Sequence, residues 1–389
     1  MRNGMTMTSM GLRSRLVTGW AIALAIVLAQ LGCASHMPQE RIRYAVRSVC
    51  NGAPQCFSTI QAALDAAGSA QTDGWVLVDV GPGNFFEKVT LTRSRTRLRG
   101  SGVDRTFLRF NAVAQDSGRF HRDHWGTPGS ATLTIDADQV VVEDMTVENS
   151  FDFLSNDALA DSDPRKIVNS QAVALLLDKH SDRVLLNRAA LLGYQDTLFA
   201  DGKRALVRHS FISGNVDFIF GGGELVVVDS TVQSRRRSAK FNVGEVQSIV
   251  AAPSTPLDQA IGIVLYRSRL THESGVPDGS VALGRPWHPT RTFADGRYAD
   301  PGAVGQVSYI DCFMDAHILA DHWTSMNGTA RDGTKTHVFQ PQESRFFESG
   351  SSGPGARRVD IGLRWADALA ITEVARMMLK DWPEARGAL

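Results

Sequence analysis

Two isolated aspartates are the first residues in this chain that could do chemistry. Asp196 stands in GYQDTL (193–198) and Asp217 opens DFIFG (217–221), and the neighbours of both are mostly small or apolar. Two carboxyl groups held close together cannot both ionise freely, so one keeps its proton while the other is an anion. Such a pair supplies an acid and a nucleophile or base, which suits the hydrolysis of an ester or a glycoside. The alternative is structural, because aspartate also closes turns between strands.

Two glutamines accompany these acids. Gln195 directly precedes Asp196, and Gln171 stands in SQAVALLL (170–177). An uncharged amide can stabilise an oxyanion without adding a competing charge. The same amides would fit an internal ladder of polar side chains equally well, so they decide nothing alone.

The segment LGRPWHPT (283–290) adds an arginine and a tryptophan. Arg285 and Trp287 are two residues apart, so in extended chain both can face the same side. Arg285 could hold a carboxylate as an anion by a forked ion pair, and Trp287 offers a flat face of the kind that packs on a sugar ring. Tyr194, Phe218 and Phe220 could line the site near the acids. A packed turn and an ordinary core are the structural alternatives.

A short repeat indicates how these residues are positioned. An apolar pair, two or three small or polar residues and another apolar residue recur in six segments. The segments are VEDMTV (142–147), LNRAAL (186–191), VRHSFI (207–212), VVDSTV (227–232), LYRSRL (265–270) and YIDCFM (309–314). Their last residues are separated by steps of 44, 21, 20, 38 and 44 residues. We read these steps as two, one, one, two and two units of a repeat.

Repeated apolar strands separated by small and polar residues predict an all-β solenoid of parallel strands, in which each coil buries its apolar face against its neighbours. The gaps are too short and too polar for the crossover helices of a doubly wound sheet. Asp196 and Asp217, one repeat apart, should therefore occupy equivalent places on adjacent coils, about 4.8 Å apart.

Two helices are predicted outside the repeat. In FSTIQAALDAAG (57–68), Ser58 or Thr59 would be the N-cap, and one face is apolar (Ile60, Ala63, Leu64 and Ala67). This helix would cover the open N-terminal end of the solenoid. The second helix, in WADALAITEVARMMLKDW (365–382), would lie against its outside. We expect a single domain from about residue 40 to residue 389.

Composition excludes several classes of partner. Lys+Arg and Asp+Glu are equal at 41 each in 389 residues, so no global field attracts nucleic acid or an anionic membrane. The basic segment SRRRSAK (234–240) is either a site for carboxylates or a solvated loop. The histidines and cysteines show no metal-ligand spacing, so we predict neither a metal nor another cofactor.

The N-terminus predicts export. Within residues 1–33, Arg13 and Arg15 precede an apolar run and then small residues, the layout of a bacterial export signal. Cys33 in LGCAS also allows a lipoprotein with a lipid on this cysteine, although Gln30 stands where an aliphatic residue is usual. Cys50 and Cys56 are expected to form a local disulfide in an oxidising compartment, and Cys312 to be a buried thiol.

Four ordered blocks, SQAVALLL, GYQDTLF, DFIFGGG and LGRPWHPT, together resemble the pectin methylesterases, a family that removes methanol from methylated polygalacturonate (pectin). GNFFEKV (83–89) resembles an N-terminal block of the same family. FDFLSNDALADSDPRKI, GRPWHPTRTFADGRYADP and SRFFE are similar to its bacterial plant-pathogen branch. The resemblance covers most of the mature chain and implies a right-handed parallel β-helix. Phe85, Phe199 and Gly221–Gly223 depart from the usual blocks.

The resemblance also implies roles. Asp217 matches the nucleophile of a covalent aspartyl-ester mechanism, and Asp196 the acid that protonates methanol and then activates water. Gln171 and Gln195 match the oxyanion-stabilising amides, and Arg285 the arginine that orients the nucleophile. Positions that match substrate contacts of the family are Trp287, Thr132, Val216, Thr290 and Met314. The resemblance implies pectin as the substrate and no cofactor; we expect a secreted monomer.

Two other classes remain open. A calcium-dependent pectate lyase would need a cluster of acidic metal ligands, whereas the acids here stand beside glutamines. An outer-membrane lipoprotein of the same fold could bind sugar or hydrolyse another ester. The lipoprotein alternative rests mainly on Cys33.

Overall fold

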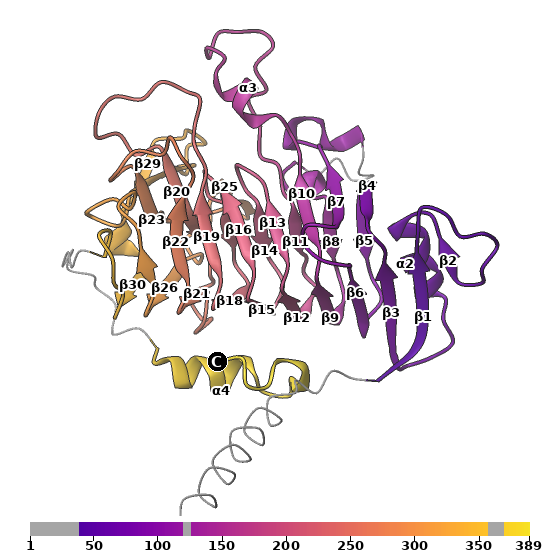
Figure 1. Ribbon diagram of the computed structural model, residues 1–389. Coiled ribbons are helices and arrows are strands. Elements are labelled where there is room, and N and C mark those ends of the chain that lie inside the picture. Colours follow the sequence, from indigo (N-terminus) through magenta and orange to yellow (C-terminus); the bar gives the residue numbers. More distant parts are fainter. Residues whose placement is uncertain (1–38, 120–125, 357–368) are drawn as a thin grey trace, which may run out of the picture.

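The structure, a computed structural model, describes residues 39–119, 126–356 and 369–389. The predicted export signal and Cys33 lie outside these residues. Within the described ranges, no helix is long and apolar enough to cross a membrane. Figure 1 shows a solenoid whose strands stack side by side along one axis. The predicted fold, a right-handed parallel β-helix, is confirmed.

Three long parallel sheets, named sheets A, B and C here, form the sides of the solenoid in the described part of the chain. Sheet A contains, in order, β2 (Cys56–Phe57), β1 (Glu40–Val46), β3 (Trp75–Val80), β6 (Thr96–Arg99), β9 (Asp138–Glu143), β12 (Asp182–Asn187), β15 (Arg204–Arg208), β18 (Glu224–Val228), β21 (Ile263–Tyr266), β26 (Gln306–Ile310) and β30 (Arg345–Ser349). Sheet B contains β4 (Gly83–Phe86), β7 (Thr106–Phe110), β10 (Thr146–Asn149), β13 (Ala190–Leu192), β16 (Phe211–Gly214), β19 (Thr231–Ser234), β22 (Arg269–His272) and β27 (Phe313–Met314). Sheet C contains β5 (Val89–Leu91), β8 (Leu133–Ile135), β11 (Leu175–Leu177), β14 (Leu198–Ala200), β17 (Ile219–Gly221), β20 (Ser248–Pro253) and β23 (Val281–Gly284).

The remaining elements lie outside these sheets. Two antiparallel hairpins pair β24 (Thr290–Phe293) with β25 (Gly296–Ala299), and β28 (Met326–Gly328) with β29 (His337–Phe339). The α-helices are α2 (Ile60–Gly68), α3 (Phe153–Asp157) and α4 (Ile371–Met378). Short 3-10 turns are η2 (Ala114–Arg119), η3 (Pro128–Ser130), η4 (Pro341–Glu343) and η5 (Pro383–Ala385).

The sequence repeat corresponds to the turn from sheet A into sheet B. The third residue of every segment has a left-handed backbone, with φ between 46° and 54°, and these residues are Asp144, Arg188, His209, Asp229, Arg267 and Asp311. The apolar ends stack in register and are buried, as Val147 pairs with Leu191 and Leu191 with Ile212. Each coil therefore buries its apolar residues only on its neighbours, as the repeat predicts.

The predicted number of units per step was wrong for the long steps. Val142 pairs directly with Leu186, 44 residues later, so this step is one coil and not two. The same holds for the steps of 38 and 44 residues further on. The additional residues leave the solenoid between sheets B and C, at 150–174 and 235–247, or follow sheet C, as in the β24–β25 hairpin. Strand pairing fixes the coil, while the connections vary in length.

Helix α2 covers the N-terminal end, as predicted. Thr59 is the N-cap, and the buried residues are Ile60, Ala63, Leu64 and Ala67. The Gln61 amide accepts the N–H of Thr90 (2.7 Å) and donates to its carbonyl (3.2 Å). Because Thr90 belongs to β5, the edge strand of sheet C, this side chain pairs with main-chain groups that would otherwise remain open.

Helix α4 packs against the outer face of sheet A, which confirms the second predicted helix where it is described (Figure 1). Val374 and Met378 are buried against an apolar row of this face that includes Leu185, Leu206 and Val226. The cysteines also match the prediction, because Cys50 and Cys56 form a disulfide and Cys312 is buried and free.

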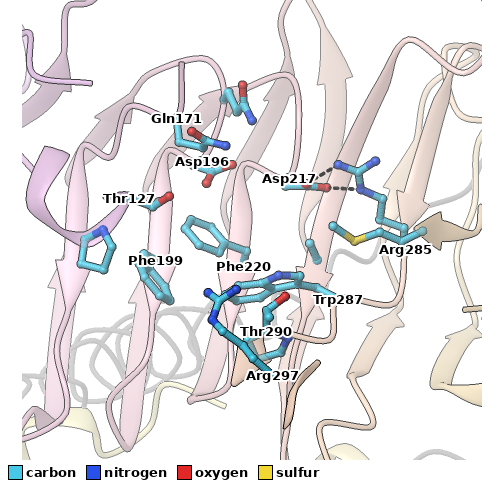
Figure 2. A pocket seen from close by; sticks show the side chains of 15 residues that line it. Thr127, Gln171, Asp196, Phe199, Asp217, Phe220, Arg285, Trp287, Thr290 and Arg297 are labelled. Carbon is cyan, nitrogen blue, oxygen red and sulfur yellow. Dashed lines mark hydrogen bonds and ion pairs between the residues drawn. The ribbon is translucent and has the colours of Figure 1, made fainter. Parts of the chain in front are cut away.

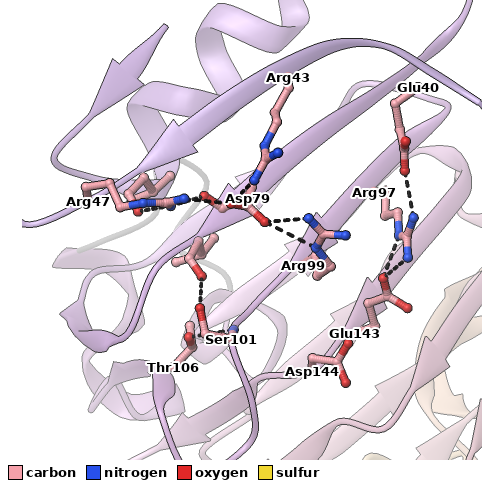
Figure 3. Close-up of polar contacts among 12 residues, drawn as sticks. Glu40, Arg43, Arg47, Asp79, Arg97, Arg99, Ser101, Thr106, Glu143 and Asp144 are labelled. Atoms are coloured by element: carbon pink, nitrogen blue, oxygen red, sulfur yellow. Dashed lines mark hydrogen bonds and ion pairs between the residues drawn. The ribbon is translucent and has the colours of Figure 1, made fainter. Parts of the chain in front are cut away.

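A charge cluster occupies the N-terminal part of the outer face of sheet A (Figure 3). The Asp79 carboxylate accepts hydrogen bonds from Arg43 (2.7 Å), Arg47 (2.7 Å) and Arg99 (2.8 Å). Burial alone would raise the pKa of Asp79, but the hydrogen bonds from the three arginines outweigh burial and lower this pKa. The cluster thus joins β1, β3 and β6 by contacts that require an ionised aspartate.

Replacing Asp79 with asparagine should lower the free energy of unfolding by roughly 1.5–3 kcal/mol at neutral pH, the range for hydrogen bonds to charged groups. Because the folded-state pKa is lowered, this stabilisation is present above the ordinary aspartate pKa of about 4 and lost as pH falls below it. Urea unfolding of both proteins at several pH values measures the difference. Asp321→Asn, at an exposed aspartate, is the control. A difference that stayed constant down to strongly acidic pH would contradict the assignment.

Candidate active site

A cavity of about 570 Å³ lies over the outer face of sheet C. Its lining comes from the ends of neighbouring coils and from the two hairpins. The lining residues are Thr127, Pro128, Gln171, Gln195, Asp196, Phe199, Asp217, Phe220, Ala252, Arg285, Trp287, Pro289, Thr290, Arg297 and Met326. Both predicted acids, both glutamines, Arg285 and Trp287 therefore meet in one place, which Figure 2 shows from close by.

The two aspartates occupy equivalent places on adjacent coils, as their spacing predicts. Asp196 lies in the turn from β13 to β14, and Asp217 in the turn from β16 to β17. Two residues later Leu198 pairs with Ile219, and the Asp196 N–H donates to the Val216 carbonyl (3.0 Å). Both aspartates have a left-handed backbone, with φ of 65° and 50°. Aspartate adopts this conformation more readily than most residues, and such strain concentrates at functional sites.

Arg285 pairs with Asp217 in a fork. Its Nε donates to Oδ1 (2.8 Å) and its Nη2 to Oδ2 (2.5 Å), the contacts drawn as dashed lines in Figure 2. Arg285 follows β23 directly, and the strand register places it level with Ala252 and Phe220, from where its side chain reaches Asp217. Two parallel charge-assisted bonds fix the plane of the carboxylate and place a positive charge beside it.

Asp196 has no such ion-pair partner, and its surroundings raise its pKa. Burial raises its pKa well above the ordinary value, the charge of Asp217 raises it further, and Arg285 opposes these effects only in part. Among the described residues, no hydrogen bond reaches the Asp196 carboxyl. The cavity thus holds a carboxyl group whose pKa is raised beside a carboxyl group paired with an arginine, the contrast that an acid and a nucleophile require.

The glutamine amides flank this pair. The Ser170 hydroxyl donates to Gln195 Oε1 (3.1 Å), so the amide N–H groups of Gln195 remain available to a ligand. Gln171 Oε1 is buried without a hydrogen-bond partner in the described part of the chain. A buried acceptor of this kind is costly until a neighbouring O–H or a ligand donates to it.

An apolar floor lies beside the acids. Phe199 and Phe220 pair across β14 and β17 and stack with ring centres 4.2 Å apart. Trp287 meets both rings edge to face, at 6.1 and 5.6 Å. Of the aromatic residues expected near the acids, Phe220 lines the cavity. Phe218 instead belongs to the solenoid core and is fully buried, and Tyr194 stacks on Phe153.

Of the four other residues predicted to contact substrate, one lines the cavity and three do not. Thr290 lines the cavity. Met314 is fully buried in the solenoid core, and the fully buried Thr132 donates its hydroxyl to the Glu148 carbonyl (3.0 Å). Val216 is half-buried and, like these two, is not among the lining residues. The structure therefore does not bring Thr132, Val216 or Met314 to the cavity, and we do not retain them as substrate contacts.

Several lining residues were missed in the sequence, among them Thr127, Arg297 and Met326. Thr127 precedes η3, Arg297 lies on β25 and Met326 begins β28. The Arg297 side chain is exposed and forms no hydrogen bond or ion pair with the described residues. None of the three belongs to the repeat, and no spacing within the chain connects them with the acids.

Metal ligation was tested on the same geometry. Among the residues that the structure describes, no group of three or more histidine, cysteine, aspartate or glutamate side chains could hold a metal ion. The cavity thus offers acid, carboxylate, amides and an arginine on an apolar floor. This set can attack and protonate a neutral acyl ester.

Comparison with known proteins gives consistent matches. The model of the family described as Pectinesterase matches residues 47–334. Pectinesterase A of Dickeya dadantii (strain 3937) is 39% identical over 365 residues, which cover 93% of this chain and 96% of that protein.

Solved structures resemble the fold over a similar length. A crystal structure of pectin methylesterase in complex with a hexasaccharide has a TM-score of 0.80 and 37% identity, covering 89% of this chain and 98% of that chain. Pectin methylesterase from Yersinia enterocolitica has a TM-score of 0.76 and 40% identity, covering 84% and 99%.

Proposed function

Since this chain belongs to the pectinesterase family, we propose that it is a carboxylic ester hydrolase that removes methyl groups from pectin. Methanol and a free carboxylate on the polygalacturonate chain are the products. The observation that carries the proposal is the contrast between two carboxyl groups in one cavity. Asp217 is paired with Arg285, whereas the pKa of Asp196 is raised by burial.

In the first step, a carboxylate oxygen of Asp217 attacks the C6 carbonyl carbon of a methyl-esterified sugar. The carbonyl oxygen becomes an oxyanion, to which the amide N–H groups of Gln195 and Gln171 donate. The bond from C6 to the methoxy oxygen then breaks, and Asp196 gives its proton to the departing methanol. The sugar remains bound to Asp217 through C6 as a covalent acyl intermediate.

In the second step, Asp196 is a carboxylate and takes a proton from water. The resulting hydroxide attacks C6 and the bond to Asp217 breaks, and the sugar carboxylic acid that forms gives its proton to the solvent and leaves as a free carboxylate. Asp196 regains its proton, and Asp217 returns to its pair with Arg285. Both residues end in their starting states, so the cycle consumes only water.

The cavity lining supports a sugar ring that carries a small apolar group. Phe199, Phe220 and Trp287 supply flat apolar surface, and sugar rings pack on such faces. Met326 adds a flexible apolar side chain at the same cavity. We place the ring against these residues and the methyl ester next to Asp196 and Asp217.

The test is methanol release from highly methylated polygalacturonate by the purified mature protein. We expect release from the methylated polymer and none from a fully de-esterified control. A rise in ultraviolet absorbance without methanol would indicate bond cleavage by elimination and would support the lyase. No methanol and no absorbance change would refute both and favour a sugar-binding protein or an esterase for another ester.

Location and assembly remain proposals. We propose secretion, so that the enzyme reaches pectin outside the cell, with an outer-membrane lipoprotein anchored at Cys33 as the alternative. Mass spectrometry of the mature N-terminus distinguishes the two. We propose a monomer, because α2 covers one end of the solenoid, and no cofactor, because each step above is assigned to a side chain.

A further inference from the structure

Two of the three arginines of the SRRRSAK segment, Arg235 and Arg237, point into the protein rather than into solvent. The segment begins at the end of β19 and continues into the excursion 235–247 between β19 and β20. The side chains of Arg235 and Arg237 are only 25% and 16% exposed, whereas that of Arg236 is 54% exposed. The two buried arginines therefore have specific partners, which the cavity itself does not include.

Arg235 forms hydrogen bonds to the turn that contains Asp196. Its Nη1 donates to the Gly193 carbonyl (3.0 Å), and its Nη2 donates to the Tyr194 hydroxyl (2.7 Å). The guanidinium also lies over the Tyr194 ring, 3.7 Å from its centre. Gly193 and Tyr194 directly precede Gln195 and Asp196, so these contacts act on the main chain of the active-site turn.

Arg237 binds a second excursion, residues 150–174, next to the same turn. It forms a forked ion pair with Asp157 of α3 (2.6 and 3.0 Å), and Asp157 also accepts the N–H groups of Ser238 and Ala239. In Figure 1, α3 lies in a loop that projects beyond the edge of the solenoid. Phe153, the first residue of α3, stacks on Tyr194 with ring centres 5.2 Å apart and planes 9° apart. Arg235 and the excursion that contains α3 thus both contact Tyr194.

The other end of that excursion also reaches the turn. Ser170 donates to Gln195 Oε1 (3.1 Å). Main-chain hydrogen bonds tie the turn 193–196 to the neighbouring coils, and Arg235, Phe153 and Ser170 add side-chain contacts to it. These contacts come from two excursions that are distant in sequence.

These side-chain contacts matter for the acid because the Asp196 carboxyl has no hydrogen bond of its own within the described residues. The Asp196 backbone is left-handed, with φ of 65°. The place of this carboxyl follows from its main chain alone. A displacement of about 1 Å in a catalytic group can cost on the order of a hundredfold in rate.

We propose that Arg235 is a positioning residue for the active-site turn, acting with Tyr194 and with the excursion that the Asp157–Arg237 pair fastens. In this role it keeps the Gln195 amide and the Asp196 carboxyl in place without contacting substrate. The proposal rests on the proposed esterase function, since it assigns the turn a part in that reaction.

The experiment compares Arg235→Met with Arg236→Met, a matched change in the adjacent and more exposed arginine. For Arg235→Met we expect kcat to fall about 10- to 100-fold, with KM changed less than about twofold because no substrate contact is lost. The high-pH limit of activity should also move to lower pH, since a looser turn buries Asp196 less and its pKa falls. Arg236→Met should match the wild type in kcat, KM and pH profile.

Further variants separate positioning from folding. Arg235→Lys keeps one donor for the Gly193 carbonyl but loses the flat guanidinium, so it should recover part of kcat. Tyr194→Phe keeps the stacked ring and loses only the hydroxyl, so its loss should be smaller than that of Arg235→Met. A lowered melting temperature with unchanged kcat and pH profile would overturn the proposal and leave Arg235 a purely structural role. A change in KM alone would also overturn it, and an inactive wild type would count against the proposed function instead.

Discussion

Asp217→Asn should release essentially no methanol, with turnover lowered on the order of 10⁴-fold or more, as when a covalent nucleophile is removed from a hydrolase. Asparagine has nearly the same shape, but its amide is a poor nucleophile. The substitution also removes the negative charge of the carboxylate, whose oxygens lie 2.5 and 2.8 Å from the Arg285 nitrogens Nη2 and Nε. The guanidinium then acts on Asp196 without opposition, so the pKa of Asp196 should fall and the acid should be lost as well. Methanol assays over a range of pH measure both effects.

Asp201 provides a matched control for this change. It follows β14, the strand that Asp196 precedes, and burial raises its pKa too, yet it is not among the cavity-lining residues. Asp201→Asn should therefore keep most of the wild-type activity. Circular dichroism should show the same fold for both variants. If Asp217→Asn released methanol at more than about a hundredth of the wild-type rate, Asp217 could not be the nucleophile.

Asp196→Asn should reduce methanol release by about 10²- to 10⁴-fold, the usual contribution of a general acid or base. The asparagine cannot protonate the leaving methanol. Because burial, followed by the charge of Asp217, raises the pKa of Asp196, the wild-type residue is protonated below that pKa and loses its proton as pH rises through it. Wild-type activity should therefore fall at high pH, and this limb of the profile should vanish in the variant.

An ester with a better leaving group separates the two roles of Asp196. In an aryl ester of the same uronic acid, the phenolate leaves without taking up a proton. The variant should therefore give a rapid burst of the phenol, about one per enzyme molecule. Turnover should then stall, because no base activates water for the second step. Mass spectrometry should find the acyl group on Asp217. If the methyl and aryl esters were slowed equally and without a burst, Asp196 would not be the acid.

The sequence predicts the positions that the repeat controls. Coil stacking follows from the apolar pattern, and the pairing of Asp196 and Asp217 follows from their spacing of one coil. The same pattern predicts that Met314 is a core residue and not a substrate contact, because Met314 ends the last repeat segment and pairs with buried Leu270. Every equivalent residue in the series is a core residue. For the place of Met314, the repeat is therefore a better predictor than the resemblance to the family.

Three of the residues that were missed lie outside the repeat. Thr127, Arg297 and Met326 come from a short turn and two hairpins, and each reaches the cavity through the path of its connection. The lengths of such connections are not set by strand pairing, which also explains why the long steps were misread as two coils. Buried polar partners such as Asp157 and Arg237 are 80 residues apart, and no periodicity relates them.

The placement of the two aspartates on adjacent coils has a consequence for how such an enzyme can change. Main-chain hydrogen bonds between β14 and β17 set the separation of the coils, and they do not involve any side chain of the cavity. Changes in the β24–β25 and β28–β29 hairpins, which supply Thr290, Arg297 and Met326 to the cavity, can therefore alter which polymer fits without changing the distance between Asp196 and Asp217. Substrate preference can then diverge among descendants while the reaction stays the same.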